Sequence, residues 1–134
     1  MTAARVEPVG PTVLLVEDEE IVRNLVCELL TAQGYTVLEA RDGREALETN
    51  ERHQGRIDLL LTDVVMPRMS GREVADRLRE RRPQTRVLYM TGYADHAIVQ
   101  EGVLDPGTEL LEKPFTFETL QHKVRSILDE PLAA

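Results

Sequence analysis

The amino-acid sequence predicts an α/β fold, a doubly wound five-stranded parallel sheet with the strand order 2-1-3-4-5. Short apolar segments alternate five times with helical segments, and this alternation indicates parallel strands joined by right-handed crossovers. The central apolar run, residues 59–61, leads to a single carboxylate, Asp63, and Pro67 stops it four residues later. Such a run, bounded by turn signals, is typical of a strand buried on both faces of a sheet.

The five predicted strands are short segments rich in β-branched and aliphatic residues. They cover residues 12–16, 35–40, 57–62, 87–90 and 110–111. Ligands of open α/β sheets bind outside the carboxyl ends of the strands, at the point where the strand order reverses. In this order that point lies between the first and third strands, so we expect a site where Glu17, Asp18 and Asp63 meet.

The first three predicted helices are defined by apolar residues at helical spacing and by capping residues. The first helix ends at Gly34, and its apolar stripe consists of Val22, Leu25, Val26 and Leu29. A capping box that begins at Asp42 opens the second helix, which runs to about residue 53. A second capping box begins at Ser70 and opens the third helix, which Pro83 ends.

Two further helices complete the alternation. A short helical stretch is expected from Ala94 to between Gly102 and Pro106. Thr116 then caps the last helix, whose apolar face consists of Phe117, Leu120, Val124 and Ile127.

Length and composition fit one globular domain. The chain has 134 residues, 42% of them hydrophobic and 30% charged, which is ordinary for a soluble domain with a real core. Residues 1–10 mix small residues, prolines and a glycine without periodicity, so we expect a flexible leader. The domain itself is predicted over residues 11–129, followed by a tail at residues 130–134.

Charge and cysteine content exclude several function classes. The net charge of −8 argues against direct binding to nucleic acid, which needs a basic surface. No apolar run approaches the ~20 residues of a membrane span, and the start of the chain lacks a signal-peptide pattern. Cys27 is the single cysteine and forms no internal disulfide, so we expect a cytoplasmic protein without membrane contact. Among 16 basic residues only Lys113 and Lys123 are lysines.

Polar residues from four strand ends are expected to converge: Glu17 with Asp18, then Asp63, Thr91 and Lys113. Three crowded carboxylates raise one another's pKa unless a cation joins them, and hard oxygen ligands suit Mg²⁺. A lysine offers a compact charge to a phosphoryl oxygen, and a threonine hydroxyl donates to another. The set is therefore typical of phosphoryl transfer with one carboxylate as the nucleophile.

These residues lie in four segments that resemble the receiver domain of two-component response regulators. The segments are Val16-Glu17-Asp18, residues 61–71 (Leu-Thr-Asp-Val-Val-Met-Pro-Arg-Met-Ser-Gly), Met90-Thr91-Gly92 and Lys113-Pro114-Phe115. The similarity spans about residues 11 to 129, in the right order and spacing. It implies a flavodoxin-like fold and a phosphoaccepting signalling domain rather than an enzyme.

The resemblance also implies a role for each matching residue. Asp63 is the phosphoacceptor, Thr91 the switch hydroxyl and Lys113 the contact to the phosphate. Mg²⁺ is bound by Glu17, Asp18 and Asp63 together with the backbone carbonyl of Val65. The bond between Lys113 and Pro114 is expected to be cis, as is usual in such domains.

Two departures bear on the output of such a domain. Receivers often carry Tyr or Phe three residues before the lysine, where this chain has Leu110. The preceding helix is brief, because Gly102 and Pro106 break it. The segment around Thr91 and residues 102–107 look like those of receivers at the C-terminus of hybrid sensor histidine kinases. A free-standing single-domain response regulator is the alternative.

The expected partner is a histidine kinase or a histidine phosphotransferase domain, which would pass a phosphoryl group to this chain in a phosphorelay. Ile21 lies off the apolar stripe of its helix and next to the acids, so it is a candidate docking residue together with Pro114. Its alternative role is that of a partly covered surface residue. Without an aromatic residue at position 110 we expect the phosphorylated chain to remain monomeric.

Other readings of single residues stay open. Asp18 has an alternative role as the N-cap of the first helix. A Mg²⁺-dependent phosphatase with an aspartyl nucleophile is a competing function, but it commonly needs a second acid two residues on, where Val65 stands. A flavin-binding module of the same topology would need a Gly/Ser/Thr-rich loop after the first strand, where four acids stand instead. His53, His96 and His122 lack metal-ligand spacing.

Overall fold

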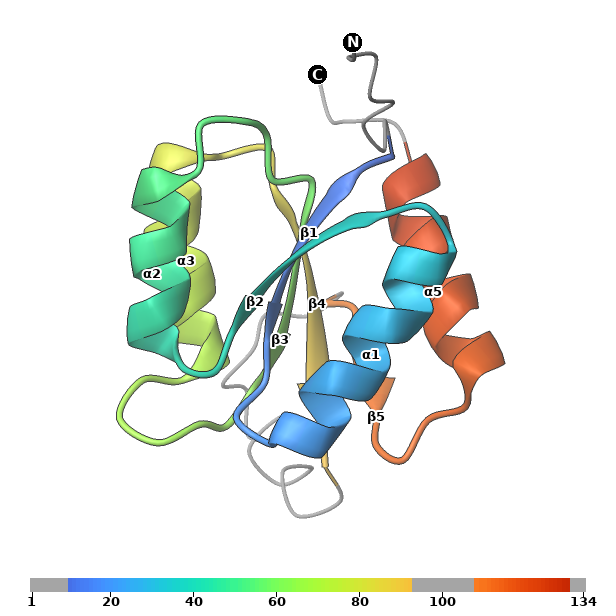
Figure 1. Ribbon diagram of the computed structural model, residues 1–134. Coiled ribbons are helices and arrows are strands. Elements are labelled where there is room, and N and C mark those ends of the chain that lie inside the picture. Colours follow the sequence, from blue (N-terminus) through green and yellow to red (C-terminus); the bar gives the residue numbers. More distant parts are fainter. Residues whose placement is uncertain (1–9, 93–107, 131–134) are drawn as a thin grey trace, which may run out of the picture.

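The computed structural model describes residues 10–92 and 108–130 and contains a single five-stranded sheet with all neighbouring strands parallel. The strand order is β2-β1-β3-β4-β5, so the predicted fold class is confirmed (Figure 1). The strands are β1 (Thr12–Val16), β2 (Thr36–Ala40), β3 (Leu59–Asp63), β4 (Arg86–Thr91) and β5 (Leu110–Glu112). The central strand begins two residues later than predicted and includes Asp63 itself.

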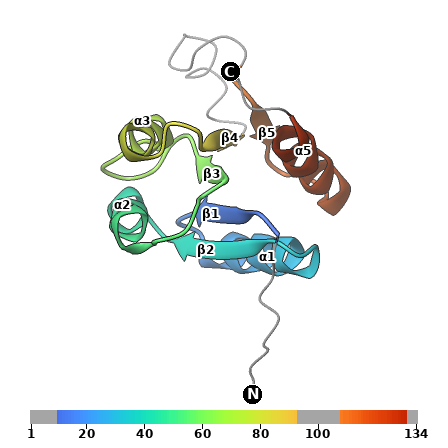
Figure 2. The ribbon, with the colours of Figure 1, turned by 90° about the horizontal axis from the view of Figure 1, so that it is seen from above.

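Helices cover both faces of the sheet in the described part of the chain. They are α1 (Glu20–Ala32), α2 (Gly43–Arg52), α3 (Gly71–Arg81) and α5 (Phe117–Asp129). Helices α2 and α3 lie on one face and α1 and α5 on the other, as Figures 1 and 2 show. The helix predicted from Ala94, the leader up to residue 9 and the tail from residue 131 lie outside the described residues. None of the helices described is long and apolar enough to cross a bilayer.

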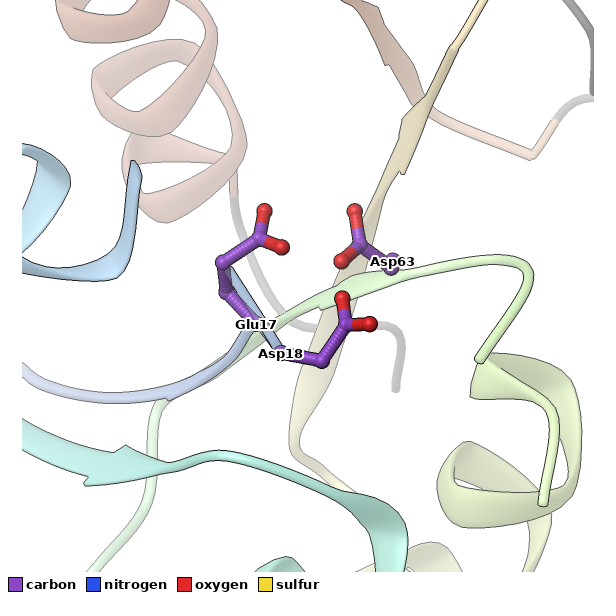
Figure 3. Close-up of side chains that lie close together, drawn as sticks. All are labelled: Glu17, Asp18 and Asp63. Carbon is purple, nitrogen blue, oxygen red and sulfur yellow. The ribbon is translucent and has the colours of Figure 1, made fainter. Parts of the chain in front are cut away.

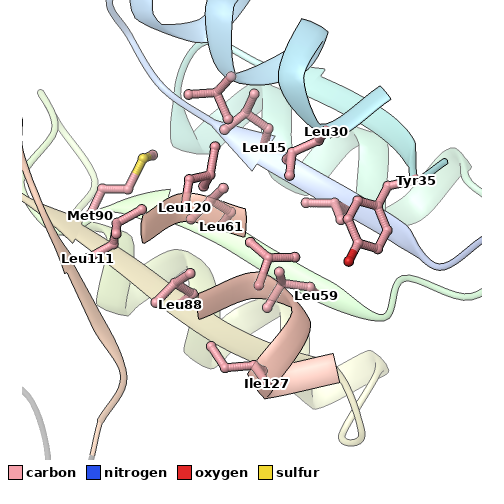
Figure 4. Close-up of a cluster of buried hydrophobic side chains, with 13 residues drawn as sticks. Leu15, Leu30, Tyr35, Leu59, Leu61, Leu88, Met90, Leu111, Leu120 and Ile127 are labelled. Atoms are coloured by element: carbon pink, nitrogen blue, oxygen red, sulfur yellow. The ribbon is translucent and has the colours of Figure 1, made fainter. Parts of the chain in front are cut away.

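Strand periodicity divides the core into two layers, one on each face of the sheet. In β1, Val13 and Leu15 point toward α1 and α5, whereas Leu14 and Val16 point toward α2 and α3. The first layer, drawn in Figure 4, consists of Val13, Leu15, Val26, Leu30, Tyr35, Leu59, Leu61, Leu88, Met90, Leu111, Leu120, Val124 and Ile127. All five residues of β3 are buried, because β3 has strands on both sides and helices on both faces. The ends of β1 and β3 are therefore held rigidly.

The predicted N-caps of three helices are confirmed. The side chain of Asp42 accepts a hydrogen bond of 2.8 Å from the amide of Glu45. Ser70 and Thr116 accept equivalent bonds at the starts of α3 and α5. Helix α1 differs, because its N-cap is Glu19 and no side chain makes a capping bond there. The alternative role of Asp18 as an N-cap is therefore wrong.

Two predicted core positions are wrong. Leu25 is 55% exposed, because α1 is turned so that Val26 and Leu30 face the sheet and Leu25 lies about 100° away on the helix. Phe117 is 44% exposed although it shares an angular position with the buried residues of α5. It is the first residue of its helix, where fewer neighbours along the axis are available to cover a side chain.

Arginines on or before β4 bind the carboxyl ends of two helices, at the opposite end of the sheet from Asp63. The guanidinium of Arg82 donates to the side chain and backbone oxygens of Asn50 and to the carbonyls of His53 and Gly55, which closes the end of α2. Arg86 donates in the same way to the last carbonyls of α5. These bonds satisfy carbonyls that a helix end otherwise leaves unpaired.

Candidate functional site

The sheet brings the predicted residues from four strands to one edge. Val16 pairs with Thr62, so the residues that follow, Glu17 and Asp63, lie at neighbouring strand ends. Asp63 pairs in turn with Met90 of β4, which places Thr91 at the end of the next strand. Lys113 follows β5, and its amide donates to the carbonyl of Thr91 at 2.8 Å. The predicted convergence of these residues is therefore present.

Glu17 is fully buried and both of its carboxylate oxygens have donors. Its Oε1 accepts from Lys113 Nζ at 2.7 Å, and its Oε2 accepts from the Glu19 amide at 3.0 Å. Its own amide donates to the carbonyl of Ala40 on β2 at 3.1 Å. A buried carboxylate is stable only when it is paired and hydrogen-bonded in this way.

Asp63 is 5% exposed and shares the same lysine, because Lys113 Nζ lies 2.8 Å from its Oδ1. Its backbone is fixed by close packing against the start of α3. A Cβ atom added to Gly71 would lie only 1.9 Å from the Asp63 carbonyl oxygen, so no larger residue fits at Gly71 without a shift of the backbone. The amide of Gly71 also donates to Val64 at 2.8 Å. The carboxylate of Asp63 therefore extends from a backbone that is fixed by pairing with β4 and by close packing against the start of α3.

The two buried carboxyl groups differ in their affinity for a proton. The pKa of Asp63 is raised to about 8; burial is the largest cause, the neighbouring Glu17 adds to it, and Lys113 opposes it. Burial acts to raise the pKa of Glu17 as well, but hydrogen bonds from Asp63, Lys113 and the Glu19 amide outweigh it and lower that pKa. The predicted rise in pKa from crowding is therefore present at Asp63, whereas at Glu17 hydrogen bonds that include one from the Lys113 cation lower the pKa.

Glu17, Asp18 and Asp63 form an acidic cluster that fits a small hard cation. One carboxylate oxygen from each residue lies within 4.8 Å of the others, and Figure 3 shows the three side chains converging. Carboxylate oxygens are hard ligands of the kind that Mg²⁺ prefers, so these three residues could hold such an ion. The carbonyl of Val65 accepts no hydrogen bond from residues 10–92 or 108–130, which leaves it available to such an ion.

The remaining predicted residues lie close in the chain to these strand ends. Thr91 is buried at the end of β4, and the bond between Lys113 and Pro114 is cis, as expected. Pro114 is exposed, and Ile21 is 82% exposed in the first turn of α1. Ile21 is thus a surface residue with little cover, and its role in docking stays a prediction.

Sequence reasoning missed one residue that contacts the site. The guanidinium of Arg23 lies beneath the loop after β1, with Nη1 donating to the carbonyl of Glu17 at 2.9 Å. Arg23 is the only basic residue between Glu17 and Arg41, and this isolation among acids was the available signal.

Comparisons with known proteins agree with this arrangement. A family model described as the response regulator receiver domain matches residues 13–125. The sensor kinase CckA of Brucella abortus is 40% identical over 119 residues, which cover 89% of this chain and 13% of that protein. The response regulator receiver protein CpdR of the same organism is 32% identical over 116 residues, which cover 87% of this chain and 95% of that protein. This chain thus spans a small part of one relative and nearly all of the other.

Solved structures give the same result. The receiver domain of the hybrid histidine kinase CckA is 36% identical, with a TM-score of 0.74 over 88% of this chain and 99% of that chain. The Vibrio cholerae chemotaxis protein CheY4 is 34% identical, with a TM-score of 0.77 over 89% of this chain and 99% of that chain.

The raised pKa of Asp63 predicts how the stability of the metal-free protein depends on pH. The folded state binds the Asp63 proton more tightly than the unfolded state does, so protonation of Asp63 stabilises the folded protein. This stabilisation is complete below pH 4 and is lost as the pH rises through 8. One pKa unit corresponds to about 1.4 kcal/mol, so we expect the free energy of unfolding to fall by at least that much between pH 5 and pH 9. The measurement is urea unfolding with chelator present. Asp63→Asn, which cannot titrate, should remove the fall; an equal pH dependence in that variant would contradict the assignment.

Proposed function

This chain belongs to the response regulator receiver family of two-component systems, and we propose that it accepts a phosphoryl group on Asp63 from a phosphohistidine donor. Receiver domains are phosphoacceptor signalling domains. The observation that carries the proposal is the buried carboxylate of Asp63, which lies 2.8 Å from Lys113 and within an acidic cluster suited to Mg²⁺. In the reaction an Asp63 oxygen bonds to phosphorus while the bond from phosphorus to the histidine nitrogen breaks, and its electron pair stays on that nitrogen.

Each group around Asp63 has a proposed role in that transfer. The side chains of Glu17, Asp18 and Asp63 and the carbonyl of Val65 would hold Mg²⁺, which offsets the negative charge of carboxylates and phosphoryl oxygens. Lys113 would supply a positive charge beside Asp63, and Thr91 would supply a hydroxyl donor. Loss of the Asp63 proton is needed before attack, and the Lys113 ammonium favours that loss.

The competing chemistries have less support. An aspartyl phosphatase commonly places a second acid two residues after the nucleophile, and the half-exposed Val65 has no group that transfers a proton. A flavin phosphate would meet the acids that follow β1, including the buried Glu17, and these would repel it.

We further propose that the domain works in a phosphorelay as the C-terminal receiver of a hybrid histidine kinase. The similarity to the sensor kinases CckA and LuxN, the latter of Vibrio campbellii and 35% identical over 129 residues, supports this context. A free-standing regulator in the cytoplasm is the alternative, supported by the similarity to CpdR over nearly its whole length.

The partner is proposed to dock over α1 and the loops beside Asp63, through Ile21 and Pro114. Receiver domains interact with histidine kinases or phosphotransfer proteins. In the described part of the chain, the exposed large apolar residues all lie near this edge of the sheet; they are Ile21, Leu25, Val65 and Phe117. We propose that the phosphorylated domain stays monomeric, because Leu110 packs as an aliphatic residue against the core and offers no ring to rotate.

The first prediction concerns the nucleophile. Asp63→Asn should abolish labelling by acetyl phosphate while the fold remains, because the volume is nearly unchanged and the nucleophilic oxygen is lost. Intact-mass spectrometry should detect one labile adduct on the wild-type protein with Mg²⁺ and none with chelator. Adduct formation on the Asn variant at the wild-type level would refute the assignment, while steady release of phosphate from an ester would favour a phosphatase.

The second prediction concerns Lys113, and the only other lysine of the chain is its control. Lys113→Arg should slow phosphorylation by roughly 10-fold or more, because a planar fork on a longer stem cannot fit between Glu17 and Asp63. Lys123→Arg keeps a surface pair with Glu109 and should label at the wild-type rate. Equal rates for both variants would show that Lys113 makes no specific contact.

The third prediction separates docking from chemistry. Ile21→Ala should slow transfer from a phosphohistidine protein, because an exposed apolar anchor is lost from the interface. The same variant should accept phosphate from acetyl phosphate at the wild-type rate, since that small donor needs no docking surface. Unchanged transfer from every histidine-bearing partner that phosphorylates the wild type would exclude Ile21 from the interface.

A further inference from the structure

Arg23 is a largely buried cation that connects three elements near the acidic cluster. It lies in the first turns of α1, and its side chain is 16% exposed. Its Nη1 donates to the carbonyl of Glu17 at 2.9 Å, and its Nε lies 3.6 Å from Glu39 Oε1 on β2. One planar side chain thus joins α1, the loop after β1, and β2.

The peptide that Arg23 holds is the one that leads to Asp18. The carbonyl of Glu17 belongs to the same rigid plane as the amide of Asp18, so fixing this oxygen fixes the direction in which the chain continues. The amide of Glu17 is already fixed by Ala40 on β2, which leaves the rotation of the next peptide as the remaining freedom. Arg23 removes that freedom.

Asp18 has one other supporting bond beside it: the Glu19 amide donates to Glu17 Oε2 at 3.0 Å, but that bond does not involve the peptide between Glu17 and Asp18. It is exposed, and no side chain of residues 10–92 or 108–130 donates a hydrogen bond to its carboxylate. It does not cap α1 either, since the N-cap is Glu19. The approach of Asp18 toward Glu17 and Asp63 therefore depends on the backbone that carries it.

We propose that Arg23 is a positioning residue for the Mg²⁺ site, which orients the peptide between Glu17 and Asp18 so that Asp18 points into the acidic cluster. This inference rests on the proposed function, because it takes that cluster to be the metal site. Residues that hydrogen-bond to metal ligands and orient them commonly contribute roughly 10- to 100-fold to metal affinity. Arginine suits the task because its planar guanidinium directs Nη1 to the carbonyl of Glu17 and Nε toward Glu39 in a fixed geometry.

The sign of the effect separates positioning from simple electrostatics. Arg23 carries a positive charge close to a site for a divalent cation, so its removal on charge grounds alone would tighten Mg²⁺ binding. Loss of orientation would instead weaken it. The two explanations predict opposite changes in the same dissociation constant.

The test compares Arg23→Met with Arg82→Met in the full 134-residue chain. Both changes remove one arginine that donates to backbone carbonyls, but Arg82 lies at the far end of the sheet. Mg²⁺ dissociation constants are measured by calorimetry or by amide shifts on titration with magnesium chloride, with urea unfolding as a measure of stability. We expect Arg23→Met to bind Mg²⁺ about 10-fold or more weakly and Arg82→Met to bind it as the wild type does. At saturating Mg²⁺, Arg23→Met should recover the wild-type rate of labelling by acetyl phosphate.

Three results would overturn the proposal. They are unchanged or tighter Mg²⁺ binding by Arg23→Met, equal weakening by both variants, and labelling of Arg23→Met that stays slow at saturating Mg²⁺. A wild-type protein that binds no Mg²⁺, or binds it as well after Asp63→Asn, would instead refute the metal site itself and the present proposal with it.

Discussion

The ammonium of Lys113 between the buried carboxylates of Glu17 and Asp63 is the interaction on which the site depends. Its two contacts, 2.7 and 2.8 Å, bring one positive charge to two acids that are almost entirely removed from water. Two carboxylates and one ammonium leave an excess negative charge, so a proton or a second cation must balance it. A proton is favoured on Asp63, whose pKa is raised by burial and by the neighbouring Glu17, and the acidic cluster offers a place for a second cation.

The strand order makes this contact possible. Because β1 and β3 are neighbours, two strand ends that are far apart in sequence bring Glu17 and Asp63 together, and Lys113 reaches them from beyond β4. A helix layer on each face holds these strands, and the amide of Glu17 adds one more bond to β2. The site therefore takes its precision from the sheet, while its reactive groups lie on the short connections that follow the strands.

The two ends of the sheet have different tasks. At the amino ends of the strands, Arg82 and Arg86 close the carboxyl ends of α2 and α5 and stabilise the fold. At the carboxyl ends, charges are crowded, and the exposed apolar residues Ile21 and Phe117 lie nearby. An apolar anchor beside a reactive carboxylate suits a partner protein that must bring its own reacting atom close.

The sequence by itself determined the elements, their order and most of the site. Local patterns predicted a parallel sheet with an acid at its edge; they are the apolar runs of strand length, capping residues such as Asp42 and Ser70, and the acid at the end of the central strand. The strand order, and with it the convergence at Asp63, came partly from the resemblance to receiver domains. Helical spacing alone did not decide which side chains are covered, because Leu25 and Phe117 depend on how a whole helix lies against the sheet.

Only the tertiary structure decided how the charges at the site are shared. The proton affinities of Glu17 and Asp63 differ because burial, with the neighbouring Glu17, raises the pKa of Asp63, whereas hydrogen bonds from Asp63, Lys113 and the Glu19 amide outweigh burial at Glu17. None of these contacts is visible in residue spacing. The contact of Arg23 with the Glu17 carbonyl likewise arises where a helix, a strand and a loop meet. Burial and cross-strand pairing are properties of neighbours from distant parts of the chain, and for that reason local sequence patterns do not specify them.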